Sequence, residues 1–331
     1  MSTVAGTDDN ALRMRNKRRE LSIFLQRWGV FIGLIMLVII FSFSSPHFLN
    51  ARNLMNIARQ TSINAIIAVG MTYVIITAGI DLSVGSVLGL STVVVATLIT
   101  ELGIPAVPAI ILTLLVGMTI GSTVGFSVAY LKIPPFIITL AYMTIARGLA
   151  MLITGGYPVH IDSAVLHFLG RGFVFGIPTP VIVMAIIYLL GWFTLARTKL
   201  GRHIYAVGGN YQTARLSGIR VKLVLVFVYV LTGALAALSG VLLAGRLSSG
   251  VPNSGVMFEL HIIAATILGG TSFVGGEGTV LGTLIGALLM GILSNGLNIL
   301  NVSPYVQQII QGLVIFGAVY LSVFSSRNQT E

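Results

Sequence analysis

The sequence lacks cysteine altogether and is poor in charged residues. Without a thiol the chain forms no disulfide framework and no thiolate metal site, and we expect no redox chemistry. Charged residues make up 8% of the 331 residues, whereas about one quarter of a typical soluble domain is charged. Hydrophobic residues make up 56%. This composition excludes a large soluble domain and is typical of a membrane protein.

Long apolar runs recur along almost the whole chain. A bilayer core requires roughly 20 mostly apolar residues for each helical crossing. Ten segments meet this description, at residues 28–43, 62–80, 84–100, 106–130, 136–153, 178–196, 223–245, 259–274, 279–300 and 305–324. We therefore predict an all-α, polytopic membrane protein with about ten transmembrane helices and both termini in the cytoplasm.

The basic residues support this orientation. With ten crossings, fourteen of the 19 Lys and Arg residues lie on the inner side and four on the outer side, while Arg147 falls within a segment. Such an excess marks the cytoplasmic face. The net charge of +10 is explained by topology, so we expect the lipid bilayer and no nucleic acid as partner. The chain divides into a basic cytoplasmic tail (1–27), a transmembrane domain (28–324) and a short cytoplasmic tail (325–331).

Glycines recur at a spacing of four in three places: Gly85 and Gly89; Gly117, Gly121 and Gly125; and Gly278, Gly282 and Gly286. Small residues at this spacing form a helix face on which another backbone can pack closely. Tight helix packing is therefore the expected role of most of these glycines.

The stretch TAGIDLSVGS (77–86) contains an aspartate, Asp81, between two apolar runs. An aspartate at the centre of a spanning helix costs about 2.5 to 3.5 kcal/mol on translocon scales. The flanking Gly79 and Gly85 indicate a break, where the carboxylate can cap a helix that begins at Leu82 or Ser83. A structural cap and a direct role in translocation both remain open for Asp81.

The longest basic loop covers residues 197–222. Within it, Asn210 is suited to cap a short helix over Tyr211–Ser217, and Gly218 is suited to end it. Lipid-facing charge accounts for the Arg and Lys residues of the loop but not for this order of capping residues. The sequence therefore predicts an ordered helix on the cytoplasmic side.

Four motifs in order resemble one family. They are GIDLSVGS (79–86), LGRHIYAVGGNYQTARLSGIRV (200–221), AGRLSSG (244–250) and ILGGTSFVGGEGTVLGTLIGALLMGILSNGLNIL (267–300). Together they resemble the membrane permease subunits of ribose-type monosaccharide importers of the ATP-binding-cassette class, a family that also serves xylose, galactosides and allose. The similarity covers nearly all the chain beyond residue 28.

The resemblance implies a multi-pass subunit of the bacterial inner membrane that works by alternating access. Its implied partners are a second permease subunit, as in a homodimer, two ATPase subunits in the cytoplasm, and a periplasmic sugar-binding protein. It also implies that a cytoplasmic helix at Gly208–Gly218 couples the permease to the ATPase. The residues expected there are Arg202, Gly208, Gly209, Asn210, Ala214, Arg215 and Gly218.

The chain has no nucleotide site of its own. A phosphate-binding loop ends in Gly-Lys-Ser/Thr, yet none of the four lysines, Lys17, Lys132, Lys199 and Lys222, follows a glycine. No histidine pair has metal-ligand spacing. We therefore expect a transport subunit rather than an enzyme, without cofactor or metal.

A monosaccharide presents hydroxyl groups and no charge, so its path requires polar side chains at intervals. The candidates are Asn64, Thr72, Asp81, Ser83, Asn295, Asn298 and Gln307. For each of them, hydrogen bonding between helices explains the residue at least as well as contact with substrate.

Two other functions remain open on the residues alone. In an ion-coupled secondary transporter of a small polar solute, Asp81 or Glu277 would carry a proton or help to bind sodium. A structural or regulatory membrane subunit would have no pathway. The sequence does not identify the sugar.

Overall fold

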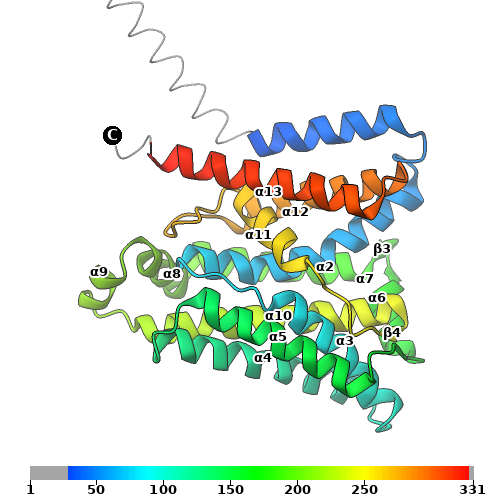
Figure 1. Cartoon of the computed structure of the whole chain (residues 1–331), viewed down its shortest axis with the longest axis horizontal. Coiled ribbons are helices and arrows are strands. Elements are labelled where there is room, and N and C mark those ends of the chain that lie inside the picture. Colours follow the sequence, from blue (N-terminus) through cyan, green and yellow to red (C-terminus); the bar gives the residue numbers. More distant parts are fainter. Residues whose placement is uncertain (1–28, 328–331) are drawn as a thin grey trace, which may run out of the picture.

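The computed structural model describes residues 29–327, and most of this part of the chain is helical (Figure 1). The predicted basic tail at 1–27 and the last four residues lie outside the described range.

Each predicted apolar segment corresponds to a helix. These are Gly29–Ser44, α2 (Ala51–Ile76), α3 (Val84–Thr100), α4 (Ala106–Ala129), α5 (Pro135–Thr154), α7 (Thr179–Arg197), α10 (Val221–Leu247), α11 (Phe258–Leu268), α12 (Val280–Ile299) and α13 (Pro304–Arg327). The prediction of a mostly helical chain is confirmed.

The helices differ in whether they can span a bilayer alone. Five of the described helices are long and apolar enough to do so: α4, α5, α7, α10 and α12. In contrast, α11 has only 11 residues, which extend over about 16 Å of a hydrocarbon core about 30 Å thick. Non-helical chain must complete any crossing made by α11, and the count of ten crossings stays a prediction.

Two predicted boundaries are wrong. The segment at 62–80 belongs to a helix that starts at Ala51 and ends at Ile76, because the Asn50 side chain caps its start by accepting from the Arg52 N–H at 3.1 Å. The segment at 259–274 ends at Leu268, where two glycines follow. The second of them, Gly270, has φ +85°, which a helix does not accommodate.

Several elements were not predicted. A short helix, α6 (Ala164–Arg171), follows α5, and another, α8 (Lys199–Gly209), precedes α9 (Tyr211–Leu216). Four two-residue strands form two antiparallel pairs: β1 (Val159–His160) with β4 (Ser249–Gly250), and β2 (Phe173–Val174) with β3 (Ile177–Pro178).

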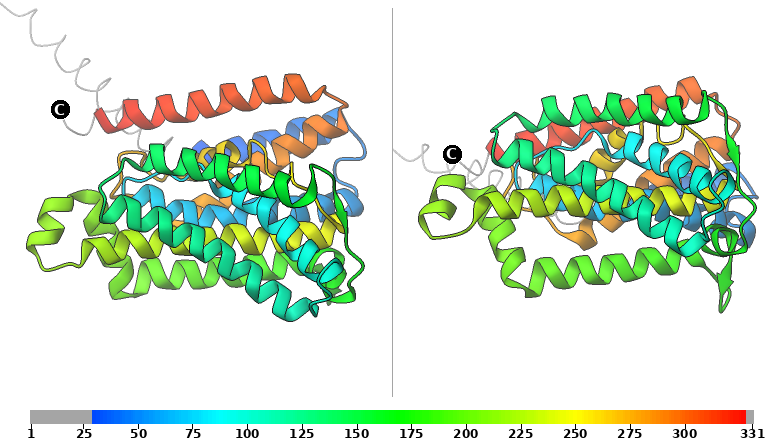
Figure 2. Two further views of the ribbon diagram at one scale, coloured as in Figure 1. Left: turned by 60° about the horizontal axis from the view of Figure 1, so that its bottom comes forward. Right: turned by 90° about the horizontal axis from the view of Figure 1, so that it is seen from below.

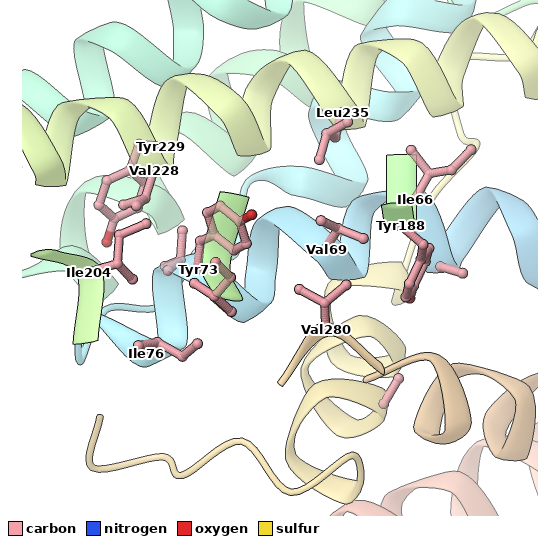
Figure 3. Packing of buried hydrophobic residues seen from close by; sticks show 14 of the residues in the cluster. Ile66, Val69, Tyr73, Ile76, Tyr188, Ile204, Val228, Tyr229, Leu235 and Val280 are labelled. Atoms are coloured by element: carbon pink, nitrogen blue, oxygen red, sulfur yellow. The ribbon is translucent and has the colours of Figure 1, made fainter. Parts of the chain in front are cut away.

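Helix α2 forms the centre of the molecule. Every residue from 61 to 76 except Asn64 is buried, and α2 contacts α7, α10, α11 and α12. Figure 3 shows its side chains Ile66, Val69 and Tyr73 packed between α10 and the start of α12. The buried Tyr73 hydroxyl donates to the Gly191 carbonyl of α7 at 2.6 Å. This hydrogen bond fixes α7 against the central helix.

The glycine faces pack helices closely, as predicted. Gly117, Gly121 and Gly125 of α4 lie against the α10 backbone near Gly233, Tyr229 and Val226. In the second half of the chain, Gly282 and Gly286 of α12 lie against Gly269 and Ala265, at the end of α11. Gly278 does not belong to this helix face, because it precedes α12 and has φ +155°.

The two ends of the helical bundle carry different elements. At one end α8 and α9 project beyond the long helices, as Figures 1 and 2 show from three directions. The helix Gly29–Ser44 begins and α13 ends toward this same end. The four strands and α6 lie at the opposite end.

Candidate functional site

The predicted helix in the basic loop is present. The Asn210 Oδ1 atom accepts a hydrogen bond from the Thr213 N–H at 2.9 Å and so caps α9. At the other end Gly218 has φ +81°, and its N–H donates to the Arg215 carbonyl. The expected start and capping residues of this helix are therefore confirmed, and α9 ends at Leu216, one residue before the expected Ser217.

The outer face of α9 is open. Ala214 is buried, whereas Arg215 is exposed and Leu216 is 88% exposed. Arg202, on the preceding helix α8, is also exposed. A cation beside an exposed leucine, at the tip of a capped helix, forms a small surface suited to contact with another protein. The sequence analysis did not select Leu216, although its position one residue after Arg215 could have indicated it.

Gly208 and Gly209 occupy different surroundings. A Cβ atom on Gly208 would collide with the Ile76 carbonyl at the end of α2, whereas one on Gly209 would meet nothing. The same Ile76 carbonyl accepts from the Gly276 N–H at 2.8 Å. The ends of α2 and α8 and the 269–279 loop thus meet at Ile76, and we call this contact the inner junction.

Asp81 lies in the segment that joins α2 to α3, and its side chain is 2% exposed. Its Oδ1 atom accepts from the Ser83 N–H at 2.9 Å and from the Ser83 hydroxyl at 2.6 Å. Helix α3 begins at Val84 with Ser83 in the capping position, so the expected start at Leu82 or Ser83 is one or two residues early. Asp81 forms an Asx turn ahead of the helix rather than its N-cap.

Four other pathway candidates make hydrogen bonds to side chains of the protein. Thr72 bonds to Thr283 across α2 and α12 at 2.7 Å. Asn295 of α12 exchanges two amide hydrogen bonds with Asn53 of α2, at 3.0 and 3.1 Å. Gln307 donates to Asn298 at 2.9 Å. The structure thus brings together Asp81 with Ser83 and Asn298 with Gln307, but it does not gather the seven candidates into one site.

Asn64 lines a small internal cavity between α2, α11, α12 and α13. The cavity has a volume of about 70 Å³, and its polar lining is Gln60, Thr61, Asn64, His261, Ser294 and Gln311. Thr61 Oγ1 and Asn64 Oδ1 are buried without a hydrogen-bond partner. Drug-sized ligand pockets have volumes of about 300 to 1,000 Å³, so this cavity is suited to water, at about 30 Å³ per molecule.

A larger cavity of about 390 Å³ lies beside the inner junction. Its lining includes Thr77 and Gly79 after α2, Lys132 before α5, Tyr211 and Gln212 on α9, and Tyr229 on α10. Helix α9 therefore borders a hollow next to the segment that carries Asp81. A hollow at this place leaves room for α9 to move relative to α2 and α4.

Arg147 makes contacts that the sequence did not reveal. From the middle of α5 its guanidinium donates hydrogen bonds to the Pro252 carbonyl and, at 2.7 Å, to the Ser254 carbonyl. Both acceptors lie in the chain between β4 and α11. The only signal in the sequence was a single basic residue inside an apolar segment.

The chain is similar to known permeases. A profile of the family described as "Branched-chain amino acid transport system / permease component" matches residues 53–319. The ribose import permease protein RbsC of Haemophilus influenzae is 46% identical over 92% of this chain and 96% of its own. RbsC of Bacillus subtilis is 46% identical over 94% and 97%, and the D-allose transport system permease protein AlsC of Escherichia coli is 40% identical over 92% and 94%.

These similarities confirm the family resemblance noted in the sequence. No solved structure matches the chain. Because the profile covers well over half of the chain and the relatives are at least 40% identical across more than nine tenths of it, the chain belongs to this family of multi-pass membrane permease components of transport systems.

Proposed function

We propose that this chain is the permease subunit of an ATP-driven importer that moves a ribose-like monosaccharide across the inner membrane. Ribose import permeases are among its relatives, and the chain contains no phosphate-binding lysine motif. A separate ATPase subunit must then supply the energy. A second copy of the permease and a periplasmic sugar-binding protein complete the proposed assembly.

The exposed, capped helix α9 is the observation that supports this proposal most directly. Helix α9 projects from the end of the bundle (Figure 2), and its Arg215 and Leu216 are exposed, so an ATPase can bind them there. An isolated helix of six residues is unstable in water. The capping residues Asn210 and Gly218 stabilise α9, although most of its surface makes no contact within the chain. Recognition by a partner gives this exposed helix a function.

The inner junction suggests how movement reaches the membrane. Gly208 of α8 lies directly against the last carbonyl of α2, at Ile76. The chain then continues through Asp81 into α3. A displacement of α8 and α9 by the ATPase would therefore move the end of α2, the start of α3 and the loop that carries Glu277. This movement is the proposed basis of alternating access.

Reconstitution tests the proposal. Vesicles that contain the permease, its ATPase and the sugar-binding protein should accumulate ribose only when ATP is supplied on the ATPase side. Permease alone should accumulate none under an imposed proton or sodium gradient. Accumulation driven by such a gradient, without the ATPase, would instead establish an ion-coupled carrier.

The coupling surface is tested by R215A combined with L216S. This variant should lose co-purification with the ATPase and at least tenfold of ATP-dependent uptake, because the exposed contact is removed. The matched control is L102S, since Leu102 is an exposed leucine just beyond the end of α3. Normal ATPase binding by the double variant would contradict the assignment of α9.

A further inference from the structure

Arg147 lies deep within a helix that can span the membrane. It is flanked by 12 residues toward the start and seven toward the end of α5, which are distances of about 18 and 10 Å along the axis. In a hydrocarbon core about 30 Å thick, the backbone of Arg147 thus lies about 10 Å inside the nearer end of the helix. A charge at this depth requires a polar environment.

The helix α3 provides space for this charge. Gly89 faces Arg147 Nη1 and the carbonyls of Pro252 and Ser254, and a Cβ at that position would crowd all three. The turns between β4 and α11 thus lie against α3 at Gly89, held there by two hydrogen bonds from Arg147. Irregular backbone occurs at membrane depth only where protein buries it or where it lines a water-filled space.

Glu259 also lies against α3. It belongs to the first turn of α11, and a Cβ on Gly85 would meet its Oε2 atom. Gly85 and Gly89 are one helical turn apart, a rise of about 6 Å. The glycine pair on α3 therefore accommodates a guanidinium and a carboxylate of opposite charge, one above the other, instead of another helix.

These two charged side chains are not fully covered by the chain. Arg147 and Glu259 are partly exposed, and Thr144, Gly148 and Asn253 beside them are exposed. Most of the neighbouring surface of α5 is apolar, for example Ile145 and Leu149. Lipid facing this polar strip would leave two charged side chains without water, at a cost of several kcal/mol. The strip therefore faces water or the second permease copy of the proposed assembly rather than lipid.

We propose that this strip lines the translocation path and that Arg147 and Glu259 bind the hydroxyl groups of the monosaccharide as it passes. That the substrate is a monosaccharide rests on the proposed function. Arg147 also positions the chain between β4 and α11, so a change at Arg147 moves one wall of the path.

The chemistry of the pair matches a polyol. Each sugar hydroxyl both donates and accepts a hydrogen bond. A guanidinium has five N–H donors, of which Arg147 spends two on Pro252 and Ser254, and the Glu259 carboxylate accepts. Hydrogen bonds to charged groups are about twice as strong as neutral ones. Arg147 and Glu259 can therefore bind neighbouring hydroxyls of one sugar without a deep, high-affinity pocket.

Single-cysteine labelling tests whether water reaches the strip. The native chain has no cysteine, so each variant reports one position. G148C is suitable, because a Cβ at Gly148 meets no other atom, and L189C on α7, where the leucine is 63% exposed, is the lipid-facing control. In vesicles of the full complex, a charged methanethiosulfonate reagent should modify G148C at least tenfold faster than L189C. If G148C and L189C were labelled at equal rates both with and without ATP, the proposal would be overturned.

Uptake by E259Q tests the role in substrate binding. We expect at least a tenfold fall in sugar imported per ATP hydrolysed, with normal membrane content, because the charged acceptor is lost. E101Q, at the exposed end of α3, is the matched control. Wild-type uptake by E259Q would refute the binding role. If the wild-type complex imports no monosaccharide, the proposed function fails, whereas labelling of G148C still decides whether the path lies here.

Discussion

Asn210 and Asp81 make the same local interaction in opposite environments. Each side chain accepts a hydrogen bond from a backbone N–H a few residues later, in both cases at 2.9 Å. Asn210 is exposed at the tip of the bundle, whereas Asp81 is 2% exposed. Water can replace Asn210 as the acceptor for the exposed Thr213 N–H, but it cannot replace Asp81 as the acceptor for the buried Ser83 N–H. The same motif is therefore a modest stabiliser in one region and a structural requirement in the other.

The two regions are also in mechanical contact. Gly208, two residues before Asn210, lies against Ile76, five residues before Asp81. The exposed helix α9 is free to respond to a partner, while the buried turn at Asp81 transmits the response only if it keeps its shape. An exposed surface at one end and a buried, hydrogen-bonded turn at the other suit a subunit that a partner moves.

The largest effect is expected at the buried turn. D81A removes the acceptor of two Ser83 donors, and an unsatisfied buried donor costs about 1 to 3 kcal/mol. The free energy of unfolding should fall by about 2 to 4 kcal/mol, seen as a lower midpoint of thermal unfolding in detergent. D81N keeps Oδ1 and should retain most of the stability. Equal losses in both variants would show that the hydrogen bonds of Asp81 are unimportant.

The contact between the two regions comes next. G208A places a methyl group on the Ile76 carbonyl, and overpacking of this kind costs about 1 to 3 kcal/mol. ATP-dependent uptake should fall several-fold and thermal stability should decrease. G209A is the adjacent control, where a methyl group meets no other atom. If G208A matched G209A in both measurements, the inner junction would not carry the coupling.

The smallest effect on stability is expected at the exposed cap. N210A removes an N-cap worth about 1 kcal/mol to α9 and should leave thermal unfolding of the membrane core unchanged. The ratio of ATP hydrolysed to sugar imported should rise, because α9 is partly unfolded when it meets the ATPase. N210S keeps a capping oxygen and should restore the ratio. An unaltered ratio in N210A would separate α9 from energy coupling.

Local rules predicted much of the fold. Apolar runs located ten of the thirteen helices between Gly29 and Arg327, and capping residues located α9 within one residue. The helices α6 and α8 were missed because they are short and amphipathic and carry no long apolar run. The end of α11 was missed because its apolar residues continue past the glycines at 269 and 270.

The candidate site was only partly predictable. Asn64 was selected for its polarity and lines a cavity, but Asn295 and Gln307 were selected by the same criterion and bond to Asn53 and Asn298. Polarity inside an apolar segment shows that a partner is needed, not which partner is present. The wall formed by Arg147 and Glu259 joins residues more than 100 positions apart, so no local pattern indicated it.

The sequence by itself determined that the chain is a membrane protein. It also determined the positions of the apolar helices and of the capped helix in the exposed loop. These features follow from hydropathy and from hydrogen bonds within a few residues. Only the tertiary structure decided that two glycines of α3 make room for the charged side chains of Arg147 and Glu259, and that Gly208 touches the end of α2. Such contacts arise from packing between distant segments, whose free energy depends on shape in three dimensions rather than on neighbours along the chain.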